Sequence, residues 1–220
     1  MLTWLTAPAP AAALVVYRLA LPDFARHREA LLGRLPAAEQ QTAATYANLL
    51  DRLRFILSRA ALRELLGQRL GLAPAAVAFG LSASGKPELL PPAGLHFNLA
   101  YAGDWLLLAL AAQPVGIDVA RANPAADVLA LAARHFSPGA QQQLRAHPNP
   151  RRAFYRHWTH YEALVKADGR GGHAPTPPDL HAWTVRGFEV AAGYPAALAY
   201  PATWQPTLAF RNLTPSGLSL

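Results

Sequence analysis

Cysteine is absent from this 220-residue sequence, which excludes disulfides and thiolate metal sites. Long apolar runs are absent too, and no segment approaches the roughly 20 apolar residues that a membrane-spanning helix needs. The stretch from Met1 to Ala12 lacks the basic start and extended apolar region of a signal peptide. We therefore expect a cytoplasmic protein with no membrane partner.

Acidic residues are scarce: 13 Asp and Glu stand against 20 Lys and Arg, which gives a net charge of +7. Such a chain attracts anionic partners, which include nucleic acid, an anionic membrane, a phosphate-rich small molecule and an acidic protein. The sequence has no RNA-recognition aromatic signature, no zinc-finger spacing and no clear helix-turn-helix. A basic nucleic-acid-binding module is therefore the weaker alternative, and we expect no nucleic-acid partner.

Two common kinds of catalytic site lack their signatures. No Gly-x-Ser-x-Gly motif occurs, which argues against a serine hydrolase. His157, His160 and His173 could be proposed as zinc ligands, but the chain has neither cysteine nor a His-Glu-x-x-His pattern. We expect these histidines to lie on a helix surface.

Twenty prolines divide the chain into short elements. The longest predicted helix covers residues 42–70, where apolar residues recur every three or four positions until Gly71 and Pro74 end the run. Strands are predicted over 13–21, 76–79, 95–99, 106–112, 115–119, 181–190 and 207–213, a turn over 84–87, and further helices over 125–134, 138–146 and 150–168. This order predicts an α+β fold of two similar halves, residues 1–113 and 114–220.

The arginines of the 42–70 helix divide into two groups. Arg52, Arg59 and Arg63 fall in one narrow sector, which is typical of a solvated stripe. Arg54 lies among apolar positions instead. Its guanidinium therefore either reaches out of the core or meets an anion at the edge of a cleft.

The segment from Val115 to Ala120 alternates apolar residues with small or polar ones. In a strand, this pattern directs Asp118 away from the face that buries the three apolar side chains. Taken alone, the segment fits a polar residue on the wet side of a half-buried strand.

A second segment carries Trp158, Glu162 and Lys166 at intervals of four, so the three side chains share one helix face. A Glu–Lys pair at this spacing is usually a surface ion pair. The neighbouring tryptophan indicates that the face is not simply exposed to solvent.

Together with the stretch between Phe79 and Trp105, these segments resemble the Sfp-type 4'-phosphopantetheinyl transferases. Residues 116–120 are similar to the family's Gly-Ile-Asp-Ile-Glu, and residues 158–169 to its Trp-Ser/Thr-x-Lys-Glu-Ala-x-x-Lys-Ala-x-Gly. Gly-Lys-Pro at 85–87 and Phe-Asn-Leu at 97–99 match its upstream motifs. The motifs keep the family's order over roughly residues 50–172, which makes the set far more specific than any single motif.

The resemblance implies a monomer with the 4'-phosphopantetheinyl transferase-like fold, whose two α/β halves form a pseudo-dimer. The implied reaction transfers the phosphopantetheine arm of coenzyme A to a serine of an acyl or peptidyl carrier protein and releases adenosine 3',5'-bisphosphate. Such phosphoryl transfer needs a divalent ion, a base for the attacking hydroxyl and positive charge for the leaving group.

The same resemblance implies a role for each matched residue. Asp118 and Glu162 would hold Mg²⁺, or Mn²⁺, and Glu162 would also act as the base, directly or through a metal-bound water. Lys166 would neutralise the departing phosphate. Arg54 and Lys86 match positions that bind the phosphates of coenzyme A, and Tyr101 falls within the phosphate-binding Ser-His-Ser of the family.

Several positions depart from the family pattern. Ala120 replaces the second acid of the strand motif, and Tyr161 replaces a lysine. Ala100, Tyr101 and Ala102 replace Ser-His-Ser, and of these only the tyrosine has a side-chain donor. The alternative is therefore a homologue with impaired catalysis, which binds coenzyme A or a carrier protein without transfer. We favour the active form because Asp118, Glu162 and Lys166 are all present.

Overall fold

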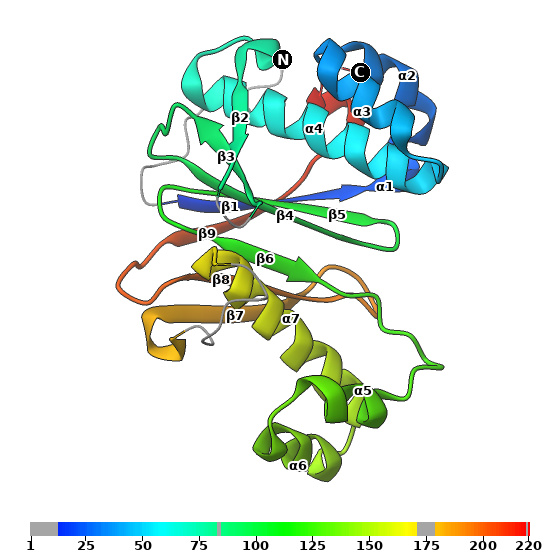
Figure 1. The fold of residues 1–220 in the computed structure, drawn as a ribbon, viewed down its shortest axis with the longest axis vertical. Helices are drawn as coiled ribbons and strands as arrows, with labels where there is room; N and C mark the ends of the chain where they lie inside the picture. Colours follow the sequence, from blue (N-terminus) through cyan, green and yellow to red (C-terminus); the bar gives the residue numbers. More distant parts are fainter. Residues whose placement is uncertain (1–12, 83–84, 171–178, 219) are drawn as a thin grey trace.

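Two β-sheets lie face to face between helices in the computed structural model, which describes residues 13–82, 85–170, 179–218 and 220 (Figure 1). The helices are α1 Leu21–Phe24, α2 Arg28–Gly33, α3 Ala37–Thr45, α4 Leu49–Leu70, α5 Val128–His135, α6 Pro138–Ala146 and α7 Pro150–Asp168. The strands are β1 Ala13–Ala20, β2 Ala78–Leu81, β3 Pro87–Leu90, β4 His96–Ala102, β5 Trp105–Ala111, β6 Gly116–Val119, β7 Trp183–Glu189, β8 Pro195–Pro201 and β9 Thr207–Asn212.

The first sheet has the strand order β4-β5-β1-β9, the second has the order β6-β8-β7, and β2 pairs with β3 separately. All the pairs are antiparallel except β1–β9, which is parallel. The predicted α+β class is confirmed. The division at 113/114 stays a prediction, and β9 of the second predicted half lies in the sheet of the first.

Each strand of the first sheet faces two different cores, because successive side chains point to opposite faces. On β1, Val15 and Leu19 join the core that α4 covers, whereas Leu14 and Val16 join the core between the two sheets. The second sheet is covered on its other face by α7 (Figure 1). The order of layers is therefore helices, sheet, sheet and helix.

Most predicted elements are present, and the ranges of α6 and α7 match the prediction to the residue. The single helix over 42–70 is wrong, because α3 ends at Thr45 and α4 begins at Leu49. Asn48 makes the break: its side chain accepts hydrogen bonds from the first backbone amides of α4, which caps the helix. The strands β3 and β8 and the short helices α1 and α2 were not predicted.

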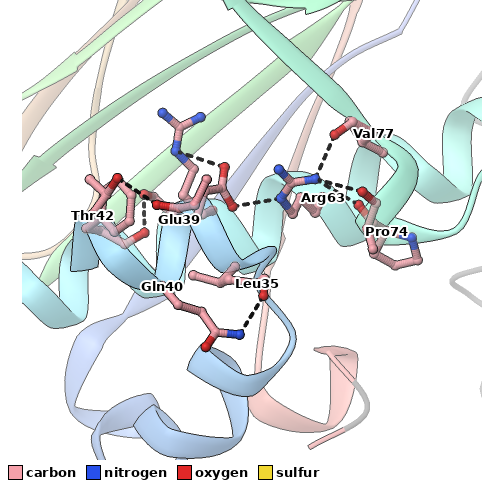
Figure 2. A network of polar contacts seen from close by, with 12 residues as sticks. Leu35, Glu39, Gln40, Thr42, Arg63, Pro74 and Val77 are labelled. Atoms are coloured by element: carbon pink, nitrogen blue, oxygen red, sulfur yellow. Dashed lines mark hydrogen bonds and ion pairs between the residues drawn. The ribbon is translucent and has the colours of Figure 1, made fainter. Parts of the chain in front are cut away.

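The predicted solvated stripe of Arg52, Arg59 and Arg63 is also wrong. Arg63 is buried, and its Nε donates to Glu39 Oε2 at 2.8 Å, while its Nη1 donates to the carbonyl of Val77 at 2.6 Å (Figure 2). Arg59 approaches the other Glu39 oxygen at 3.7 Å. Helix α3 brings this carboxylate over α4, so Arg59 and Arg63 tie the two helices together instead of facing water.

Across the ranges that the structure describes, no helix has both the length and the apolar character needed to cross a membrane.

Candidate active site

Asp118 lies on β6 and faces α7. Its neighbours Ile117 and Val119 pack in the core between the sheets, so the alternation of the strand turns Asp118 to the opposite face, as predicted. Helix α7 covers that face, and Asp118 is only 8% exposed. The carboxylate is thus enclosed between strand and helix and not on a wet surface.

Gly116 allows α7 to approach β6 this closely. A Cβ atom at this position would lie 2.0 Å from the carbonyl oxygen of Ala163 and 2.4 Å from the amide nitrogen of Ala167. Real Cβ atoms do not approach backbone atoms so closely, so only glycine fits here. The contact sets the distance between Asp118 and the functional face of α7.

Lys166 of α7 forms an ion pair with Asp118, with Nζ 2.7 Å from Oδ1. The same ammonium donates to the backbone carbonyl of Ile117 at 3.3 Å. Burial raises the pKa of the Asp118 carboxyl, and the charge and hydrogen bond of Lys166 act against that rise. The lysine thus lies where it stabilises the negative charge of a buried aspartate.

Glu162 lies one helical turn before Lys166 on the same face of α7. Burial raises the pKa of its carboxyl, and the negative charge of Asp118 raises it further, while Lys166 lowers it. Two carboxylates that interact in this way, beside one ammonium, form a site suited to a divalent cation or to a proton transfer.

Lys86 lies in the connection between β2 and β3, and its side chain reaches the same region. Its ammonium donates to the carbonyl of Lys166 at 2.8 Å and to that of Val115 at 3.2 Å. Burial lowers the pKa of this amine, with Glu88 acting to raise it and Lys166 to lower it further. A cavity of about 270 Å³ opens beside Lys86 and is lined by residues 86–89 and 92–97.

Arg54 and Tyr101 lie together at the end of the first sheet. The Arg54 guanidinium is 5.1 Å from the centre of the Tyr101 ring, a cation–π contact. It also donates to the carbonyl of Gly103 at 2.7 Å and to Asp51 Oδ1 at 2.8 Å. Arg54 is therefore at the edge of the core with polar partners, and Tyr101 is exposed beside it.

The positions that depart from the family pattern lie in different surroundings. Ala120 packs against the aromatic cluster of α5, α6 and α7, which contains Phe154 and Trp158. Ala100 is buried between the sheets, and Tyr161 is exposed on α7. Trp158 also packs on this cluster and is partly buried, so it does not simply face water.

The histidines differ from one another. His157 is exposed, and the centre of its ring lies 4.3 Å from the centre of the Phe136 ring. His160 is half-buried against Gly187 of β7, where a Cβ would lie 2.5 Å from its Nε2. His173 lies outside the described residues. Among the residues that are described, no group of three or more His, Cys, Asp and Glu side chains is placed to hold a metal ion.

Asn98 is a part of the site to which the sequence interpretation gave no role. Its buried side-chain oxygen accepts a hydrogen bond from the backbone amide of Ile117 at 2.8 Å. This bond joins β4 to β6, strands of different sheets, directly before Asp118. The one signal in the sequence is an asparagine within the otherwise apolar run Phe97–Ala100.

Comparisons with known proteins cover this part of the chain. The family model of the 4'-phosphopantetheinyl transferase superfamily matches residues 114–207, which include β6 and α7. A 4'-phosphopantetheinyl transferase of Bacillus subtilis is 27% identical over 156 residues, 70% of this chain and 69% of the relative.

Two further relatives carry the same description. The 4'-phosphopantetheinyl transferase psf-1 of Bacillus pumilus is 31% identical over 135 residues, 60% of this chain and 57% of the relative. The 4'-phosphopantetheinyl transferase HetI of a Nostoc species is 37% identical over 126 residues, 54% of this chain and 53% of the relative. The chain thus spans little more than half of the length of these two. Residues 114–207, which carry β6 and α7, thus match the 4'-phosphopantetheinyl transferase superfamily.

Proposed function

We propose that this protein transfers the 4'-phosphopantetheine arm of coenzyme A to a serine of an acyl or peptidyl carrier protein, which makes it a holo-acyl-carrier-protein synthase. The observation that carries the proposal is the convergence of Asp118, Glu162 and Lys166 between β6 and α7, with Lys166 Nζ 2.7 Å from Asp118. These are the residues that match the family motifs, and the similar proteins are described as transferases of this arm.

The reaction joins the serine hydroxyl oxygen to the phosphorus that carries the pantetheine arm. The bond from this phosphorus to the oxygen bridging the diphosphate breaks, and adenosine 3',5'-bisphosphate leaves with the bond's electrons. Glu162 accepts the hydroxyl proton, directly or through water, because its raised pKa makes it a stronger base than an ordinary glutamate. Lys166 supplies positive charge to the phosphate oxygens as the bond breaks.

The residues fit a divalent cation, Mg²⁺ or Mn²⁺. The Asp118 carboxylate already pairs with a cation, the ammonium of Lys166. The carboxylate of Glu162 is close enough for its charge to interact with that of Asp118. Mg²⁺ is commonly held by one or two protein carboxylates together with substrate phosphates and water, so Ala120 need not be an acid. When bound, the ion neutralises the diphosphate oxygens; Asp118 and Glu162 would hold it.

Coenzyme A is the proposed substrate, and Arg54 and Tyr101 are proposed to contact it. Tyr101 is exposed and can donate a hydrogen bond, and Arg54 holds a positive charge against its ring. The net charge of +7 supports an anionic partner such as an acidic carrier protein. We further propose a cytoplasmic monomer without a nucleic-acid or membrane partner, which light scattering and vesicle and oligonucleotide binding assays would test.

The test is to incubate the purified protein with coenzyme A, Mg²⁺ and a panel of apo carrier proteins, and to follow carrier mass by intact mass spectrometry. Addition of the phosphopantetheine mass, lost with Glu162→Ala, would support the proposal. Binding of coenzyme A or carrier without a mass change would favour the homologue with impaired catalysis. Absence of both binding and transfer would contradict the two alternatives together.

A further inference from the structure

Lysine is rare in this chain, and both lysines lie at one place. Of the 20 basic residues, 18 are arginines, and the two lysines are Lys86 and Lys166. The Lys86 ammonium donates to the backbone carbonyl of Lys166, and the Lys166 ammonium reaches Asp118. All other basic side chains are arginines, so both lysine ammonium groups of the chain lie at the candidate active site. Lys86 contacts Lys166, and Lys166 contacts Asp118.

The carbonyl that Lys86 holds lies in the last turn of α7, which ends at Asp168. The last four carbonyls of a helix have no partner within it, and this end carries the negative pole of the helix dipole. The Lys86 ammonium, 2.8 Å from the Lys166 oxygen, supplies both a hydrogen bond and positive charge there. It is a side-chain cap of α7 that comes from another element.

The second bond of Lys86 reaches the other half of the site. Its acceptor is the carbonyl of Val115, directly before β6, at 3.2 Å. One ammonium therefore ties the end of α7 to the start of β6, the two elements that bring Lys166 to Asp118.

Hydrogen bonds at both the backbone amide and the backbone carbonyl hold Lys86 in place. Its amide donates to Ser82 Oγ at 3.1 Å, and its carbonyl accepts from the Ser82 amide at 2.8 Å. The amine therefore extends from a hydrogen-bonded position into the junction of α7 and β6. Two of the three donors of this ammonium are therefore occupied by backbone carbonyls.

We propose that Lys86 is a positioning residue that fixes Lys166 against Asp118, and that it acts on the transfer step through Lys166 instead of binding coenzyme A. The inference rests on the proposed transferase function. It differs from the role implied by the family resemblance, in which Lys86 binds the phosphates of coenzyme A. The two roles predict different kinetic effects of the same substitutions.

The decisive variants are Lys86→Arg and Lys86→Met. Arginine keeps the charge that a phosphate would need, but its planar guanidinium does not replace a compact ammonium between two carbonyls. A positioning role predicts that both variants lower kcat by about 100-fold while KM for coenzyme A stays within about threefold of the original. Arg26→Met, which removes one charge from an exposed position on the first predicted half, should leave both constants unchanged.

A phosphate-binding role predicts another pattern. Lys86→Arg would then keep most of the activity, and Lys86→Met would raise KM for coenzyme A with little change in kcat. Either result would overturn the proposal.

A second measurement requires neither transfer nor a folded variant. The original protein is treated with an amine-acylating reagent, and the two lysine peptides are followed by mass spectrometry. If carbonyls hold Lys86, it should react about tenfold more slowly than in the urea-unfolded chain, equally with and without coenzyme A. Rapid reaction that coenzyme A suppresses would overturn the proposal. Failure of every carrier protein to be modified would count against the proposed function, and labelling would then show separately whether the backbone carbonyls hold Lys86.

Discussion

Glu162 illustrates how a single residue can favour function at the expense of stability. Burial and the charge of Asp118 raise the pKa of its carboxyl above the ordinary value of 4.5. The folded protein therefore holds this proton more tightly than the unfolded chain does, so stability contributed by the protonated form is lost as pH rises through the folded pKa. At neutral pH the ionised carboxylate destabilises the fold.

We therefore predict that Glu162→Gln raises the melting temperature at neutral pH without added Mg²⁺, and that the gain disappears near about pH 4, where the glutamate is protonated. Transfer should fall by about 100-fold or more, since the base is lost. Thermal melting across pH and the carrier mass assay measure the two effects. Glu64→Gln on α4 is the control, and an equal gain in that variant would contradict the explanation.

Glu39 tests the network that links α3 to α4 in Figure 2. Its side chain and that of Arg63 are 15% and 8% exposed, so Glu39→Ala leaves a buried guanidinium without its counter-charge. We expect a loss of about 3 kcal/mol in the free energy of unfolding, measured by urea denaturation.

The matched control is Glu29→Ala, which breaks an exposed ion pair with Arg28 and should cost about 1 kcal/mol or less. Transfer by the folded Glu39→Ala protein should be unchanged, because the network lies across the first sheet from Asp118. Equal costs for the two variants would show that the Glu39 pair is not effectively buried.

At the residue scale, the sequence predicts best where one element decides the outcome. The alternation in β6 correctly predicted that Asp118 points away from the core between the sheets. The spacing in α7 predicted that Glu162 and Lys166 share one helix face. The arginine stripe failed because helix periodicity contains no information about α3, which brings Glu39 over Arg63. The hydrogen-bond partners of Lys86 come from three separate segments, so they could not be predicted from the sequence either.

The contact of α7 with β6 governs the site at the scale of the element. We predict that Gly116→Ala destabilises the protein by about 3 kcal/mol, because the new methyl group would overlap backbone atoms of α7 that cannot rotate away. Transfer by the folded fraction should also fall, since α7 must shift away from Asp118. Urea denaturation and the mass assay measure both losses.

Gly139→Ala on α6 provides the control, because a Cβ there meets nothing within 4 Å. It should leave transfer unchanged and stabilise the helix slightly, by up to about 1 kcal/mol. Stability of Gly116→Ala equal to that of this control would mean that α7 does not lie so close to β6.

Element prediction succeeded where caps and periodicity agree. Ser137 and Pro138 mark the start of α6, and both sequence and structure begin the helix there. The strand β8, Pro195–Pro201, was missed because alanine and flanking prolines are poor strand signals. Its place is set by tertiary packing, since Ala197 and Ala199 are small enough to lie beneath α7.

At the scale of the whole molecule, the excess of positive charge predicts how the partner is found. If the acceptor is an acidic carrier protein, KM for the carrier should rise about tenfold between roughly 50 and 500 mM salt, because salt screens attraction between exposed charges. Steady-state kinetics at fixed, saturating coenzyme A measure this. An uncharged serine peptide serves as the control acceptor, and equal salt effects on both would exclude electrostatic attraction of the carrier.

The α+β class followed from the order of predicted elements, but the sheet order did not. Nothing local in residues 207–212 indicates that β9 pairs with β1, since that pairing joins segments from opposite ends of the described chain. After β9, Leu213 and Leu218 also pack into the core of the first sheet, beneath α4. Such long-range placement is decided by which surfaces remain unburied after the other elements have assembled.

The parallel pairing of β1 with β9 also has a consequence for synthesis on the ribosome. The first sheet cannot close while β9 is still being translated, so the nascent chain exposes one hydrogen-bonding edge of β1 until late in elongation. That edge belongs to the apolar strand Ala13–Ala20, a template for pairing with another chain. Production of this protein should therefore be sensitive to chaperone supply and to premature termination before residue 207.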